Sequence, residues 1–162
     1  MDLLTLAKYV GIFNRQTQAY ITTAFSSMDI SFSECIFLMN LYDNEGINQE
    51  ELSSLLFIDK AATARSIKSL EQKGFITREM MKDDRRAKKL FLTNKARENK
   101  ADFYLLLEKW KDHTTKGMDE ETKDVVFKGL QAMAEKSASA NLIELSEYTK
   151  EGNEDAIKSQ TE

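Results

Sequence analysis

The spacing of apolar positions predicts helices at both ends of the chain and a region of mixed structure between them. From residue 2 to residue 27, mostly apolar side chains recur at alternating steps of four and three, which is the period of one helix face. The same spacing returns after Asp119 and continues to about residue 140. Between these stretches, the period changes from about four to two after Gly74, and a period of two is typical of strands.

Capping signals divide the region before Gly74 into three further helices. The segment 31–34 reads Ser-Phe-Ser-Glu and has the spacing of a capping box, in which the serine hydroxyl and the glutamate carboxylate bind each other's backbone amides. Asn48 and Asp59 are N-cap candidates for two short helices, and Gly74 stands where a helix ends in a left-handed residue. Only a few residues separate these two short helices, so they predict a helix-turn-helix.

The segments that follow predict a β-hairpin and then two more helices. Residues 75–81 and 88–92 alternate between apolar and polar positions and flank a basic tip. Thr93 is the N-cap candidate of a helix that runs to about residue 115. We therefore expect a mainly α fold with a small β-hairpin wing, of the α+β class. The expected architecture is a winged helix-turn-helix with N- and C-terminal dimerisation helices.

The same pattern predicts four regions along the chain. The apolar stripes on the first and last helices have little left to cover inside one protomer, so we expect them to pair two chains; a monomer that folds these helices back on itself is the alternative. The predicted regions are an N-terminal dimerisation helix at 1–30, a winged helix-turn-helix DNA-binding domain at 31–93, C-terminal dimerisation helices at 94–148 and a flexible polar tail at 149–162.

Composition adds the charge pattern to this picture. The 162 residues carry a net charge of −4, yet the segment 60–100 holds 13 Lys and Arg against 5 Asp and Glu, which leaves +8 there and −12 elsewhere. Charge separated in this way favours one face that binds a polyanion. Neither a signal peptide nor an apolar run of membrane-spanning length is found, so we expect a cytoplasmic protein with no membrane partner.

The helix at 60–73 has the composition of a recognition helix. Thr63, Ile67 and Leu70 share one face and are expected to pack inward. Small side chains on the other face let a helix enter the major groove, where Arg65 can reach a guanine edge or a phosphate. An ordinary amphipathic surface helix is the alternative. The predicted DNA-facing residues of this helix are Lys60, Ala61, Ala62, Ala64, Arg65, Lys68 and Ser69.

The basic tip at 82–89, with the sequence KDDRRAKK, is the predicted wing. Arginines at the end of a thin hairpin can enter the minor groove, where narrow stretches are strongly negative. An aspartate at its base can accept backbone amides or hold one arginine by a two-pronged salt bridge. A solvated loop with compensating charges is the alternative. The predicted wing residues are Lys82, Asp84, Arg85, Arg86 and Lys88.

The run from residue 48 to residue 96 resembles the winged-helix core of the multiple-antibiotic-resistance regulator (MarR) family. The strongest matches are ATARSIKSLEQKGFI and DDRRAKKLFLT, in which Asp84 and Arg86 match the family's Asp-x-Arg wing signature. Ala96 stands where the family often has glycine. The resemblance implies a homodimeric transcriptional regulator, either a repressor or an activator, that binds a pseudo-palindromic site in double-stranded DNA; of the two we expect a repressor.

The resemblance also implies a small aromatic effector that releases the operator, because family members often bind such ligands where the dimer helices meet the winged helix. Aromatic residues at helical spacing are also common in an ordinary core. The residues that would line this pocket are Phe13, Phe32, Phe37, Tyr104 and Trp110.

Other functions find little support in the sequence. Cys35 has no second cysteine and is expected in the core, and His113, the single histidine, cannot build a zinc site. We expect no metal, no cofactor and no enzymatic activity. The rival function is a winged-helix protein-interaction module without sequence-specific DNA binding. An RNA-binding winged helix fits less well, because RNA has a deep, narrow major groove.

Overall fold

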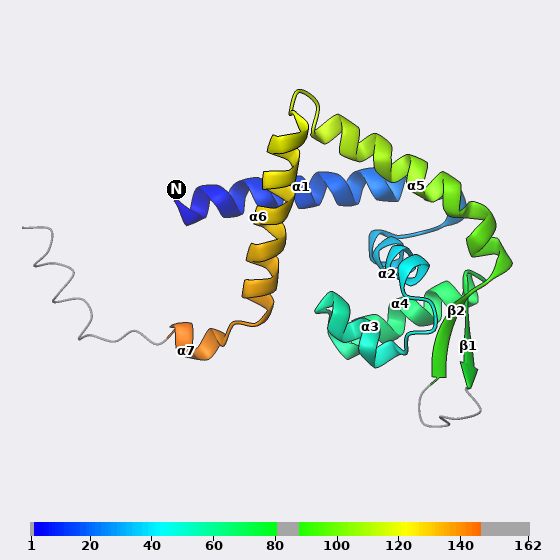
Figure 1. Ribbon diagram of the computed structural model, residues 1–162. Coiled ribbons are helices and arrows are strands. Elements are labelled where there is room, and N and C mark those ends of the chain that lie inside the picture. The colour runs from blue at the N-terminus through cyan, green and yellow to red at the C-terminus, as the bar shows by residue number, and fades with distance from the viewer. Residues whose placement is uncertain (1, 81–87, 147–162) are drawn as a thin grey trace, which may run out of the picture. The chain divides into compact units, whose positions relative to one another are not determined.

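The computed structural model describes residues 2–80 and 88–146 (Figure 1). The chain divides into two compact units, Met1–Lys116 and Gly117–Glu162. In order, the elements are α1 (Leu3–Ala24), a 3-10 turn (Ser26–Met28), α2 (Phe32–Asp43), α3 (Gln49–Leu56), α4 (Lys60–Gln72), β1 (Ile76–Met80), β2 (Lys88–Leu92), α5 (Asn94–Thr114), α6 (Glu120–Ala138) and α7 (Leu142–Ser146).

The predicted helix starts are confirmed, because each predicted N-cap side chain accepts a backbone amide of its own helix. Ser31 and Asn48 both form complete capping boxes, with the carboxylate three residues on binding the cap amide. Asp59 and Thr93, the other two predicted caps, each accept one or two amides of the first turn, and Asp119 does the same at the start of α6. The short α7 was not predicted by the periodicity.

The hairpin in the first unit is antiparallel, with Ile76 opposite Leu92 and Met80 opposite Lys88. The turn between α2 and α3 adds a short third segment to it. The Gly46 amide donates to the Leu90 carbonyl at 2.8 Å, and the Leu90 amide donates to the Ile47 carbonyl at 2.9 Å. This third segment was not predicted, and it attaches β2 to the helical part of the unit.

The core of the first unit lies where α2, α4, α5 and the hairpin meet. Phe103 of α5 is completely buried and stacks on Phe25, with ring centroids 4.6 Å apart. Cys35 is 2% exposed, which confirms its predicted place in the core, and burial raises the pKa of its thiol to about 12. Tyr20 of α1 stacks on Trp110 of α5 with centroids 4.8 Å apart. These contacts fix α5 against both α1 and the winged helix.

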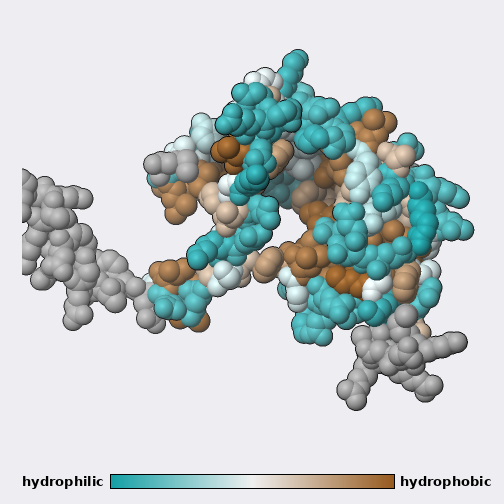
Figure 2. All heavy atoms as spheres, viewed as in Figure 1, coloured by the Kyte–Doolittle hydropathy of each residue, from teal (hydrophilic) through white to brown (hydrophobic). Residues whose placement is uncertain are grey.

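Apolar side chains stay exposed on several helices. In α1 only Ile21 is buried, and α6 buries no residue at all within the described part of the chain. Figure 2 shows brown hydrophobic side chains at the surface of α7. Across residues 2–80 and 88–146, no helix has the length and apolar character to cross a membrane. The exposed apolar residues of α6 are Val125, Val126, Phe127, Leu130 and Met133.

Candidate nucleic-acid interface

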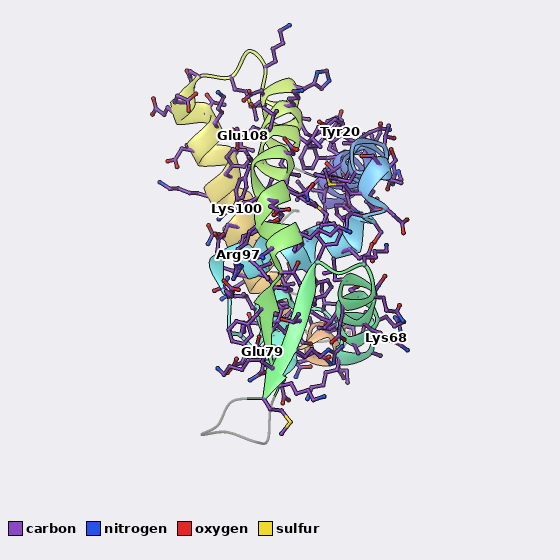
Figure 3. The ribbon with its side chains drawn as sticks, turned by 90° about the vertical axis from the view of Figure 1, so that its right-hand side faces the viewer. Tyr20, Lys68, Glu79, Arg97, Lys100 and Glu108 are labelled. Carbon is purple, nitrogen blue, oxygen red and sulfur yellow. The ribbon has the colours of Figure 1, made fainter. Side chains whose placement is uncertain are left out.

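Helix α4 presents one buried face and one polar face, as predicted. Its first turn is held by Asp59, whose Oδ1 accepts the Ala61 amide at 3.0 Å and the Ala62 amide at 2.8 Å. The inward residues Thr63, Ile67 and Leu70 are fully buried. On the other face, Lys60, Ala61, Arg65 and Lys68 are exposed, while Ala62, Ala64 and Ser69 are half-buried. Figure 3 shows Lys68 at the outer side of α4.

A cavity of about 380 Å³ lies where α3, α4 and the hairpin meet. Three cationic residues line it, namely Lys60 from α4, Arg78 from β1 and Lys88 from β2. Lys60 also forms an ion pair with Glu50 of α3, and its hydrogen bond lowers the pKa of that carboxyl group. Glu50 lines the same hollow and Arg78 pairs with Glu71 at 3.1 Å, so Lys60 and Lys88 are the two lining cations that can bind a phosphate group. The sequence did not predict that Arg78 lies at this cavity, because the alternation in a strand does not show which of its faces lies beside α4.

A second, more open hollow of about 390 Å³ lies between the start of α2 and α4. Arg65 and Ser69 of the predicted DNA-facing set line it, together with Ser31 and the pair formed by Glu34 and Lys73. The structure therefore divides the predicted residues of α4 between two hollows. Lys60 lies at the first, and Arg65 and Ser69 lie at the second.

The ion pair between Glu34 and Lys73 fixes the end of α4 to the start of α2. The Lys73 Nζ lies 2.9 Å from Glu34 Oε1 and 3.0 Å from Oε2, and the Ser31 amide donates to Oε2 at 2.7 Å. Burial alone would raise the pKa of Glu34, but hydrogen bonds from the Ser69 hydroxyl, the Ser31 amide and Lys73 together lower it. The pair thus stays ionised beneath the polar face of α4.

The predicted wing is described only in part. Lys82, Asp84, Arg85 and Arg86 lie outside the described residues, so their role stays a prediction. Lys88 is the first residue of β2, is exposed and lines the first cavity.

The five predicted effector-pocket residues lie in different environments. Phe37 is buried in the core, whereas Phe13 on α1 is 48% exposed. Phe32, Tyr104 and Trp110 are half-buried. None of the five lines either of the two hollows above. The aromatic pocket stays a prediction. Within residues 2–80 and 88–146, no group of three His, Cys, Asp or Glu side chains could hold a metal ion.

Comparisons with known proteins find relatives in both sequence and fold. A model described as MarR family matches residues 30–88. The HTH-type transcriptional regulator YybA of Bacillus subtilis is 28% identical over 152 residues, which cover 91% of this chain and 95% of YybA. The crystal structure of a MarR transcriptional regulator from Methanosarcina mazei is 32% identical, with a TM-score of 0.75, covering 82% of this chain and 96% of that one.

A second solved structure is similar over more of the chain. It is a putative MarR family regulator from Listeria monocytogenes, solved in complex with 26mer DNA. It is 24% identical, with a TM-score of 0.80, and the match covers 93% of this chain and 99% of that one. Together the comparisons confirm the predicted winged-helix fold.

Proposed function

Because the chain belongs to the MarR family of DNA-binding transcriptional regulators, we propose that it acts as a homodimeric repressor at a pseudo-palindromic operator. The observation that carries this proposal is the polar face of α4. That face exposes Arg65 and Lys68 beside small residues and lies next to a hairpin that carries Lys88. The Listeria relative that was solved with DNA has the same fold, which supports this use of the face.

The proposed contacts follow from the side chains on this face. Ala61, Ala62 and Ala64 let α4 approach the floor of the major groove, and Arg65 has the reach and the fork geometry for a guanine edge. Lys60 and Lys88 border the first cavity and are placed for a backbone phosphate, whereas Arg78 beside them is paired with Glu71. Lys68 and Ser69 complete the contacts from α4.

The proposed wing adds contacts beyond the end of β1, through Lys82, Asp84, Arg85 and Arg86. If Arg86 lies on DNA, Arg86→Ala lowers affinity and flattens the dependence of binding on salt by about one counterion per protomer. A matched control is Lys109→Ala, which removes one exposed cation from α5. Equal salt slopes for wild type and Arg86→Ala would reject the wing assignment.

The proposed homodimer rests on exposed apolar faces. Val126, Leu130 and Met133 follow one another at helical spacing on α6, and they are 40%, 39% and 45% exposed. Contiguous apolar surface of this kind marks interaction sites in proteins. A two-fold dimer would place two copies of α4 about 34 Å apart, one turn of the duplex.

The dimer is tested by sedimentation of two variants that differ by one position. Leu130→Glu places a carboxylate within the apolar stripe of α6, and Gln131→Glu places the same group one residue away, off that stripe. We expect Leu130→Glu to sediment as a monomer and Gln131→Glu to sediment as the dimer. A wild-type protein that is monomeric at micromolar concentration would reject the dimer.

The proposed effector is a small aromatic molecule bound near Phe13, Phe32, Phe37, Tyr104 and Trp110. Trp110 supplies the readout, because its indole stacks on Tyr20 and donates to the Thr17 hydroxyl at 2.9 Å. A ligand that displaces these contacts changes the tryptophan fluorescence and weakens operator binding. Aromatic carboxylates that leave both the fluorescence and the operator affinity unchanged would reject the effector.

Selection of bound sequences from random duplex DNA is the experiment that tests DNA recognition. We expect a palindromic consensus with half-sites one helical turn apart. Salt-sensitive binding without a consensus would reject sequence recognition and favour the protein-interaction module. Whether the protein represses is tested by transcription from a promoter that contains the selected site, with and without the protein.

A further inference from the structure

Glu45, in the turn between α2 and α3, binds both the end of the hairpin and the start of α5. Its Oε1 accepts the Leu92 amide at 2.9 Å and the Arg97 Nη2 at 2.6 Å. The Arg97 Nη1 in turn donates to the Leu92 carbonyl at 3.1 Å. Both polar backbone groups of Leu92, the last residue of β2, are therefore bound by this one ion pair.

The carboxylate of Glu45 continues the ladder of the third segment beside β2. Asn48 pairs with Lys89 in an antiparallel bridge, and Ile47 and Gly46 bind the amide and the carbonyl of Leu90. In an antiparallel ladder, the amides of residues two apart point to the same side. The Leu92 amide is therefore the next donor on that side. The Glu45 side chain supplies the acceptor for this amide.

The first turn of α5 has no acidic residue but contains Lys95 and Arg97. Cations at this end of a helix are disfavoured by the helix dipole, and both have partners outside the helix. Lys95 donates to the carbonyl of Lys73, the C-cap of α4, at 2.8 Å and lies 4.3 Å from the centroid of the Phe75 ring. Arg97 has Glu45 as its partner. Figure 3 shows Arg97 where α5 meets the hairpin.

Helix α5 connects the contact of Glu45 with Leu92 and Arg97 to α1. In the second half of α5, the Tyr20 hydroxyl donates to the Leu106 carbonyl at 2.8 Å, and Tyr20 stacks on Trp110. One continuous helix of 21 residues thus joins α1, part of the proposed dimer surface, to the end of the hairpin. If the hairpin tip contacts DNA, the angle at which β1 and β2 leave this helix sets where that contact falls.

We propose that the ion pair between Glu45 and Arg97 sets the direction of the hairpin relative to α5, and that both are positioning residues for DNA binding. This inference rests on the proposed function, because the hairpin needs a fixed direction only if its tip contacts DNA. The two side chains are 33% and 49% exposed, so the pair itself adds little to the stability of the fold. Its loss therefore moves the hairpin without unfolding the protein.

The first test needs no DNA. Amide hydrogen exchange is measured at Leu92 in wild type, Glu45→Ala, Glu45→Gln and Arg97→Ala. We expect exchange at least tenfold faster in Glu45→Ala, because the acceptor is lost, and a smaller increase in Glu45→Gln, which keeps an acceptor oxygen. Glu108→Ala is the matched control, since it removes the same charge from an ion pair within α5. Unchanged exchange at Leu92 in Glu45→Ala would overturn the proposal.

The second test uses the selected operator and a random duplex. Glu45→Ala and Arg97→Ala should each weaken operator binding about tenfold. The double variant should lose no more operator affinity than the more affected of the two single variants, because both substitutions remove the same interaction. Additive losses, or a loss equal to that of Glu108→Ala, would overturn the positioning role. If the wild-type protein selects no operator, the proposed function fails, and exchange at Leu92 still decides whether the pair fixes the hairpin.

Discussion

Replacing Lys73 by methionine should destabilise the protein strongly and in a way that depends on pH. Methionine keeps most of the length of the lysine side chain but removes its charge. The carboxylate of Glu34, which is 4% exposed, then keeps the Ser31 amide and the Ser69 hydroxyl but loses its cation. An ionised carboxylate in such a place has lost both water and its counter-charge.

The size of the effect follows from the burial of the two partners. Removing one member of a fully buried ion pair costs about 3–5 kcal/mol. The Lys73 side chain is itself 24% exposed, so water can reach part of the position it leaves. We therefore expect Lys73→Met to lower the free energy of unfolding by about 2–3 kcal/mol at pH 7, which is at or below the lower end of that range. Lys68→Met, at an exposed position of the same helix, should change stability by no more than about 0.5 kcal/mol.

The pH dependence separates this cause from a simple loss of packing. In the wild type the pKa of Glu34 is lowered below its ordinary value of 4.5, so its stabilising contribution is present above that value and is lost as pH falls through the folded-state pKa. Without Lys73 the cation is gone and burial raises the folded-state pKa. The variant therefore gains stability, relative to wild type, as Glu34 takes up a proton. The difference between the two proteins should shrink from pH 7 to pH 4.

Urea unfolding followed by circular dichroism measures this difference at both pH values. The protomer concentration must be held equal, because a dimer's apparent stability depends on it. The slope of the free energy of unfolding against urea should stay the same, so that the midpoints report stability. A loss of equal size at pH 7 and pH 4, or a Lys73→Met midpoint within error of Lys68→Met, would refute the reasoning.

Three further predictions concern single side chains. Arg65→Ala should weaken binding to the selected operator by about 1–3 kcal/mol and leave binding to a random duplex nearly unchanged, as measured by fluorescence anisotropy; equal losses on both would mean a phosphate contact. Phe57→Gly should stabilise the fold by about 1 kcal/mol in thermal unfolding, because Phe57 has φ of 51° and is 67% exposed; a destabilised variant would mean that the ring packs in solution. Cys35 should react with iodoacetamide at pH 8 only after urea unfolds the protein, as followed by mass spectrometry, because burial raises its pKa to about 12; rapid labelling of the folded protein would contradict this.

The sequence predicted those features that depend on residues close together in the chain. A capping box joins positions three apart, so the residues at Ser31 and Glu34 were sufficient to predict it. The inward face of α4 was equally accessible, because Thr63, Ile67 and Leu70 follow the helical period among polar neighbours. The return strand at 88–92 was predicted with its observed bounds for a similar reason, since the alternation ends at Thr93.

The contacts that hold the candidate site together were not predictable in this way. Glu34 also binds Lys73, 39 positions away, and Glu45 binds Arg97, 52 positions away. A charged residue in a helix or a turn has many possible partners elsewhere in the chain, and the local spacing of residues does not identify which one it binds. The third segment beside β2 was missed for the same reason, because Ile47 alone carries no strand period. These long-range polar contacts position α4 and the hairpin.

The structure also changes the meaning of the basic segment at 60–100. Several of its cations have partners inside the fold, including Lys73 with Glu34, Arg78 with Glu71 at 3.1 Å, and Arg97 with Glu45. Glu34 and Glu45 come from the acidic part of the chain, so part of that acidity holds the proposed DNA-binding elements in place. Only the remaining cations can neutralise phosphates, and the salt dependence of binding reports those alone. We therefore expect a salt dependence well below what 13 cations per protomer would give.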